Sequence, residues 1–127
     1  MICARRTGGD KFTLRLDEDF GAAVADELES IQAGMLGSAR ARQAEMTHED
    51  LSYDEMASAL QGSDGGAAPG FFLVPWKDDA ANEEAIKQAT KATIRCFPLD
   101  AQREAEGKAC FYSGEPATHM ALFARAF

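Results

Sequence analysis

The first part of the chain combines a short alternating segment with a long periodic one. Residues 12–16 alternate apolar and polar side chains, which is typical of a half-buried strand. From residue 17 to residue 46, apolar side chains recur at steps of three or four, the spacing of one helix face. They are Phe20, Val24, Leu28, Ile31 and Met35. Gly34 and Gly37 each weaken such a helix by roughly 1 kcal/mol, so we expect a kink or a close packing partner there.

The remainder of the chain predicts two more helices and four more strands. Ser52 and Glu55 form a Ser-x-x-Glu capping box, which predicts the start of a short helix. A third helix is predicted from Asp79 to Lys91, with acids early and lysines late, as the helix dipole favours. The strands are predicted at residues 71–74, 92–97, 108–112 and 118–126, and the intervening loops at 61–70 and 100–107. This order, strand-helix-helix-strand-helix-strand-strand-strand, predicts an α+β fold with a two-layer mixed β-sheet packed with helices.

We expect one hydrophobic core shared by these helices and strands. A chain of 127 residues is long enough for one domain, which buries roughly two-thirds of the extended chain's surface on folding. The expected core residues are Phe20, Ile31, Phe71, Leu73, Ile94 and Phe123. No apolar run approaches the roughly 20 residues of a membrane span, and no secretory leader is present, so the expected location is cytoplasmic.

The number of cysteines and the net charge argue against a disulfide-rich protein and against a strong nucleic-acid binder. Three cysteines at wide spacing argue against a disulfide framework, and Cys96 is expected to be a buried, inert thiol of an apolar strand. The chain has 13 basic and 21 acidic residues, and the segment Asp17–Glu29 carries six acids without a base. Such a surface repels a phosphate backbone, although it also fits a solvated helix face near the positive end of the helix dipole. We therefore expect weak nucleic-acid binding.

Catalytic motifs are missing from the sequence. It contains neither a glycine-rich phosphate loop after a strand nor a Gly-x-Ser-x-Gly elbow, and no functional role is predicted for His48 or His119. One segment, ACFYSGEPA at residues 109–117, does suggest a site. With a cysteine at Ser113 it would read C-x-x-C-G, a turn that presents two thiolates to a tetrahedral metal ion. The segment is therefore either a metal knuckle without its metal or an ordinary hairpin.

A series of short segments resembles one known family along nearly the whole chain. They are ARRTGGDK from Ala4, Ile31-Gln32, THE from Thr47, SYDE from Ser52, Trp76, Glu83 with Ile86-Lys87, ATIRCFP from Ala92, GKAC from Gly107 and LFARAF from Leu122. In this order they resemble the C-terminal region of proline–tRNA ligases of the archaeal and eukaryotic type. The ATIRC-x-P segment and the aromatic ending are the most specific of them.

The resemblance implies a domain plan and a degenerate zinc site. Residues 1–11 would be the junction with an anticodon-binding domain, and residues 12–127 the C-terminal domain. The family's zinc ligands are four cysteines in the order C-x4-C and C-x2-C. The matching positions here are Lys77, Asn82, Cys110 and Ser113, so only Cys110 is retained. Because a structural zinc ion needs four ligands, we expect no metal and a knuckle kept as a hairpin.

The resemblance also implies a function for the parent enzyme, by which we mean a complete ligase of this family. Such a class II enzyme uses ATP with magnesium to attach proline to tRNA, and it is a homodimer. The chain would pack against its catalytic and anticodon-binding domains and support them. Alone, it would have no cofactor or catalytic residue, bind tRNA weakly and contact no membrane. Arg125 and Phe127, where the family usually ends in Tyr, would dock on the catalytic domain. The alternative is a stand-alone, non-enzymatic interaction module derived from this domain.

Overall fold

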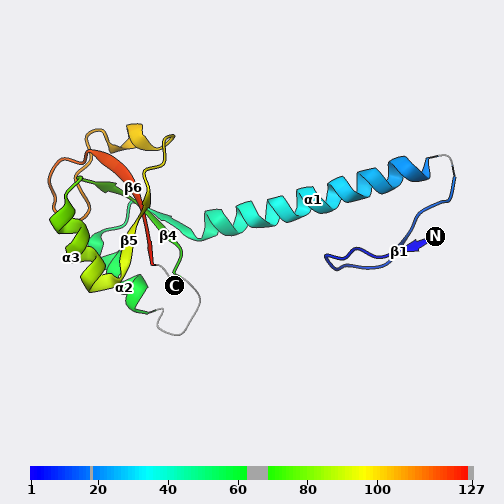
Figure 1. Ribbon diagram of the computed structural model, residues 1–127, viewed down its shortest axis with the longest axis horizontal. Helices are drawn as coiled ribbons and strands as arrows, with labels where there is room; N and C mark the ends of the chain where they lie inside the picture. The colour runs from blue at the N-terminus through cyan, green and yellow to red at the C-terminus, as the bar shows by residue number, and fades with distance from the viewer. Residues whose placement is uncertain (18, 63–68, 126–127) are drawn as a thin grey trace. The chain divides into compact units, whose positions relative to one another are not determined.

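The computed structural model describes residues 1–17, 19–62 and 69–125. It divides into two compact units between Ala44 and Glu45 (Figure 1). Among the described residues, no helix is both long enough and apolar enough to cross a membrane.

The N-terminal unit consists of a short hairpin and one long helix. Strand β1 (Ile2–Cys3) pairs antiparallel with β2 (Phe12–Thr13), so the strand predicted at residues 12–16 forms only at its start. Helix α1 (Phe20–Glu45) confirms the helix predicted over residues 17–46, and Arg42 lies in its last turn. Because the hairpin is short, α1 has no buried residue within the described chain.

The prediction of a core shared with α1 is wrong. Phe20 and Ile31 are only half-buried, and neither belongs to a core cluster. Gly34 and Gly37 also lack the close partner that we expected, because a Cβ placed at either would meet no described atom within 4 Å. The apolar periodicity identified the helix correctly, but periodicity alone does not say which surface covers its apolar face.

The C-terminal unit is built on a four-stranded mixed sheet with the order β3-β4-β6-β5. The strands are β3 (Thr47–Glu49), β4 (Phe71–Trp76), β5 (Ala92–Cys96) and β6 (His119–Arg125). β3 runs parallel to β4, whereas β6 pairs antiparallel with both β4 and β5. Phe123 lies opposite Phe72 on one side and opposite Ile94 on the other, so three apolar side chains share one face.

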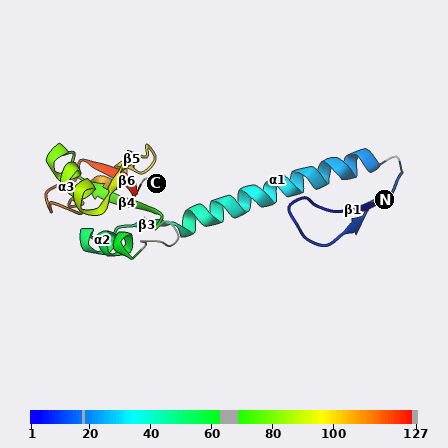
Figure 2. The ribbon, with the colours of Figure 1, turned by 60° about the horizontal axis from the view of Figure 1, so that its bottom comes forward.

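Two capped helices cover this face of the sheet. Helix α2 (Tyr53–Gln61) begins with the predicted capping box, in which the Ser52 amide donates to Glu55 Oε2 at 2.8 Å and the Glu55 amide donates to Ser52 Oγ at 3.4 Å. Helix α3 (Ala80–Thr90) begins at the cap residue Asp79 and ends at Lys91, which has a left-handed φ of 64°. Both helices lie beside the sheet in two views (Figures 1 and 2). The predicted α+β fold is therefore confirmed.

The main core lies between the two helices and the sheet. Its members are Met56, Leu60, Phe72, Val74, Trp76, Ile86, Ala92, Cys110, Ala121 and Phe123. A smaller cluster of Ala101, Ala105 and Met120 lies beside the short 3-10 helix η1 (Gln102–Ala105), within the segment predicted as a charged loop. Of the expected core residues, Phe123 is fully buried and Leu73 and Ile94 pack against the clusters, but Phe71 is 41% exposed.

The structure corrects two local predictions and adds one short strand. Cys96 is exposed, because an irregularity in the β5–β6 pairing between Ile94 and Cys96 breaks the alternation of faces. The strand predicted at residues 108–112 does not form, and a single bridge between Ala109 and Pro116 takes its place. β3 was not predicted, because three residues are too few to show an alternating pattern. Most of the predicted loop 61–70 lies outside the described residues.

Candidate functional site at the Cys110 loop

The segment that the sequence singled out forms a loop fixed to the end of β4. The Phe111 amide donates to the carbonyl of Pro75 at 2.9 Å, and the Thr118 amide donates to the carbonyl of Trp76 at 2.8 Å. Both acceptors are the last two residues of β4. The loop is thus held at both ends beside Lys77, the next residue of the chain.

Within the loop, the backbone closes a tight turn. The Gly114 amide donates to the carbonyl of Cys110 at 2.9 Å, and the Cys110 amide donates to the carbonyl of Glu115 at 2.7 Å. Gly114 has a φ of 72°, in the left-handed region that glycine adopts without strain. The knuckle-like turn that the sequence predicted is therefore present, although the flanking segments do not form a regular hairpin.

The Cys110 sulfur is buried and surrounded by hydrogen-bond donors. Burial raises the pKa of the Cys110 thiol, but hydrogen bonds from the Ser113 hydroxyl and from the amides of Ser113, Lys77 and Tyr112 outweigh it. The pKa of Cys110 is therefore lowered from its usual value, because the donors stabilise the thiolate more than burial destabilises it. Three of the four family ligand positions, Cys110, Ser113 and Lys77, are thus brought together.

Lys77 adds a positive charge beside this sulfur. Its ammonium group forms an ion pair with Glu115, on the other side of the turn. The hydrogen bond to Glu115 is the main reason why the pKa of Lys77 is raised, and the nearby Cys110 contributes to the same effect. Glu115 was not identified from the sequence, because only the closed turn brings it to Lys77.

The fourth position, Asn82, belongs to the first turn of α3, where its amide donates to Asp79 Oδ1 at 3.0 Å. Across residues 1–17, 19–62 and 69–125, no group of three or more His, Cys, Asp or Glu side chains could hold a metal ion. A knuckle without metal stays a prediction. Of the two predicted docking residues, Arg125 donates to the carbonyl of Leu60 at 3.4 Å, and Phe127 lies outside the described residues.

Aromatic side chains that sequence reasoning missed attach the loop to the core. Tyr112 meets Tyr53 of α2 edge to face, with ring centroids 4.9 Å apart. Phe111 lies 6.1 Å from Trp76 and 5.4 Å from Phe123, centroid to centroid. Burial is the main reason why the pKa of Tyr53 is raised. These residues are too far apart in the sequence for any local pattern to reveal the contact.

We expect the substitution Ser113→Ala to raise the pKa of Cys110, because it removes the hydroxyl donor to the sulfur. In the native protein, the pKa of Cys110 is lower in the folded state than in the unfolded state. Cys110 therefore contributes to the free energy of unfolding, fully at a pH above its unfolded-state pKa, and this contribution is lost as pH falls through its folded-state pKa. The measurement is the ultraviolet absorbance of the thiolate against pH, in a Cys3→Ser, Cys96→Ser background. Ser58→Ala, an exposed serine of α2, is the control. An unchanged titration of Cys110 would contradict the role given to Ser113.

Comparison with known proteins shows that this chain is similar in sequence to one group of enzymes. The family described as "Prolyl-tRNA synthetase, C-terminal" matches residues 66–127, which lie in the C-terminal unit. The proline–tRNA ligase of Chlorobium luteolum is 36% identical over 131 residues, covering 99% of this chain and 26% of the ligase. That of Chloroherpeton thalassium is 33% identical with the same coverage. That of Flavobacterium johnsoniae is 39% identical over 104 residues, or 82% of this chain and 20% of the ligase. The chain thus spans about a quarter of the length of these relatives or less.

Proposed function

The chain belongs to the family of prolyl-tRNA synthetase C-terminal domains, and from this premise we propose that it is an accessory domain of a proline–tRNA ligase. In this role it supports the ATP-dependent attachment of proline to tRNA without carrying out the chemistry itself. The observation that carries the proposal is the relationship along 99% of the chain to several curated proline–tRNA ligases. The partners proposed for it are the catalytic and anticodon-binding domains of the same enzyme, with residues 1–11 at the junction.

The proposal includes the state of the Cys110 loop. We propose that the Lys77–Glu115 ion pair and the donors around Cys110 hold the loop in place of a zinc ion. A positive ammonium group beside the sulfur supports this, because it repels a metal cation at the same place. One zinc ion per chain in the purified protein would contradict this part of the proposal.

For the parent enzyme, we propose the properties that its class implies: ATP bound with magnesium, a homodimer, tRNA binding that depends mainly on the other domains, and a location in the cytoplasm. The net charge of −8 supports weak tRNA binding by this chain alone. Arg125 and Phe127 are proposed to dock on the catalytic domain. No observation favours the stand-alone interaction module over this reading.

A chimeric enzyme tests the proposed function. In the Chlorobium luteolum ligase, the segment that matches this chain is replaced by the 127 residues, and a second version lacks the segment. We expect the chimera to keep proline activation and tRNA charging within about tenfold of the parent, which is about 1.4 kcal/mol in the barrier, and the deletion to lose far more. Removing residues 125–127 from the chimera, which deletes both Arg125 and Phe127, tests the docking proposal.

Two outcomes would contradict the proposal. A chimera that is folded and dimeric but as inactive as the deletion would show that this chain cannot replace the related segment. Full activity of the deletion itself would show that the segment has no supporting role. Analytical size exclusion and circular dichroism of each protein separate a loss of function from a loss of folding.

A further inference from the structure

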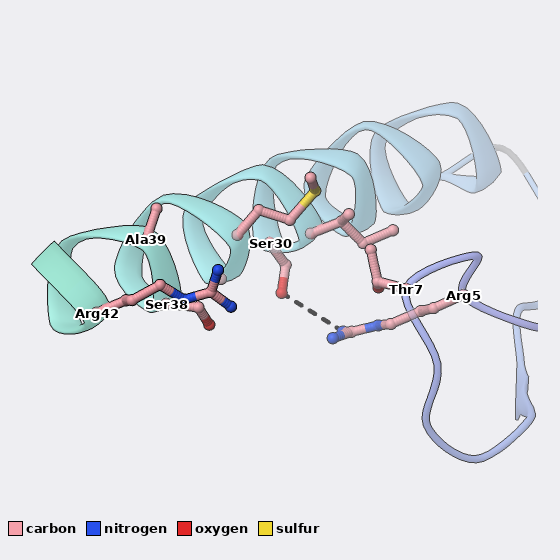
Figure 3. Close-up of a pocket in the computed structure, with 9 residues that line it drawn as sticks. Arg5, Thr7, Ser30, Ser38, Ala39 and Arg42 are labelled. Carbon is pink, nitrogen blue, oxygen red and sulfur yellow. Dashed lines mark hydrogen bonds between the residues drawn. The ribbon is translucent and has the colours of Figure 1, made fainter. Parts of the chain in front are cut away.

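The N-terminal unit contains a groove to which the proposed function assigns no ligand, although Arg5 and Thr7, which line it, belong to the proposed junction segment 1–11. The groove has a volume of about 570 Å³ and lies between α1 and the segment that follows β1 (Figure 3). Arg5 and Thr7 line one side, and Ser30, Gly34, Ser38 and Arg42 line the other. These four helix residues are spaced at steps of four, so they follow one face of α1.

Arg5 is fixed at one end of this groove. It forms an ion pair with Glu27 of α1, in which Nη2 donates to Oε2 at 3.1 Å, and Nη2 also donates to Ser30 Oγ at 3.4 Å. A guanidinium group held in this way loses little side-chain freedom when a ligand binds. The contact with Glu27 therefore positions the Arg5 guanidinium group and also partly balances its charge.

Arg42 approaches the groove from the other end. In Figure 3 its side chain runs along the helix towards Arg5, past Ser38. Among the described residues, the Arg42 side chain has no ion-pair or hydrogen-bond partner. It also lies in the last turn of α1, where the helix dipole keeps a cation favourable. The groove thus has a guanidinium group at each end and hydroxyl groups between them.

Guanidinium groups and hydroxyls are among the donors that bind phosphate oxygens in proteins. The groove has an apolar wall as well, which Ile31 and Met35 provide. Its volume falls in the range of small-molecule sites, roughly 300–1,000 Å³. We propose that this groove binds a small phosphate ester, with the phosphate between Arg5 and Arg42 and the apolar part of the ligand against Ile31 and Met35.

The charge around the groove favours a small ligand over a nucleic-acid strand. The N-terminal half of α1 carries Asp26, Glu27 and Glu29, and the chain has a net charge of −8. A strand of RNA that extends beyond the groove would meet these carboxylates, whereas a single phosphate ester contacts only the groove.

Binding of ADP to the 127-residue chain tests this proposal by isothermal titration calorimetry at low salt. We expect a dissociation constant of about 0.1–1 mM for the native chain. Arg42→Gln should weaken binding about tenfold or more, because it removes charge-assisted hydrogen bonds to the phosphate. The matched control is Arg40→Gln, which changes the net charge equally but lies outside the groove and should leave the affinity unchanged.

A second pair of variants tests the place of binding without a change in charge. Gly34 lines the groove and Gly37 does not, and a Cβ at either position meets no described atom within 4 Å. Gly34→Leu should therefore fill the groove and abolish ADP binding, whereas Gly37→Leu should preserve it. Both replacements raise helix propensity, so circular dichroism should report an intact α1 in each.

The same titration with pyrophosphate and with a short single-stranded RNA identifies the ligand class. ADP should bind more tightly than pyrophosphate, because only ADP contacts the apolar wall, and equal affinities would overturn that contact. The proposal is overturned by an absence of ADP binding up to about 5 mM, by equal losses in Arg40→Gln and Arg42→Gln, or by RNA that binds more tightly than ADP through Arg42.

Discussion

Replacing Phe123 by alanine is expected to lower the free energy of unfolding of the C-terminal unit by about 3–5 kcal/mol. Phe123 is fully buried in β6, and its ring lies 5.4 Å from the ring of Trp76 and 5.4 Å from that of Phe111. It is also paired with Phe72 on the neighbouring strand β4. The substitution would leave a cavity that rings anchored on three different segments cannot easily fill.

Unfolding in urea, followed by tryptophan fluorescence, measures this loss. Trp76 is the single tryptophan of the chain and is itself fully buried in the same core, so its emission reports this unit. Circular dichroism serves as a second probe of the same transition. The control is Leu99→Ala, where the native side chain is 92% exposed and the expected change is within about 0.5 kcal/mol. A loss for Phe123→Ala as small as the control's would show that the core is not organised around this ring.

Replacing Gly70 by alanine is expected to lower the free energy of unfolding of the C-terminal unit by at least about 2 kcal/mol. Gly70 has a φ of 90°, and a Cβ built on it would lie 2.1 Å from the carbonyl oxygen of Met46. The same oxygen accepts a hydrogen bond from the Phe71 amide at 2.8 Å, where β4 begins next to β3. The methyl group would therefore have to displace a backbone that also closes the sheet.

Gly107→Ala separates the two causes of this loss. Gly107 has a similar φ of 76°, but a Cβ there would meet no described atom within 4 Å. The Gly107→Ala variant should lose only about 1–2 kcal/mol of unfolding free energy, which is the cost of a non-glycine residue at a positive φ. Urea unfolding of both variants gives the comparison, and equal losses at the two glycines would show that the contact with Met46 carries no energy.

Local patterns in the sequence were sufficient for the helices and for the turn at the candidate site. The Ser52 cap and the apolar period of α1 act over a few residues, so the sequence alone identified them. The neighbours of α1 and the exposure of Cys96 depend on contacts and register between distant segments, and those predictions were wrong. A local sequence pattern contains no information on such distant contacts, so it cannot predict burial that depends on them.

The candidate site divides in the same way. The turn around Ser113 and Gly114 could be inferred from its residues, and the resemblance placed Lys77 near Cys110. The ion pair of Lys77 with Glu115 and the ring contact of Tyr53 with Tyr112 join residues 38 and 59 positions apart. Side chains at such separations meet only through the finished sheet, so a single sequence contains no signal for them.

The position of β6 in the sheet bears on how this protein is made. β6 is the last described strand in the sequence, but it lies between β4 and β5, which do not pair with each other. During synthesis, β4 and β5 leave the ribosome first and expose the edges to which β6 will bind. The buried ring of Phe123 reaches Phe72 and Ile94 at the same step. The C-terminal unit therefore completes its core only after translation has passed residue 125, and until then a nascent chain presents two open strand edges to chaperones.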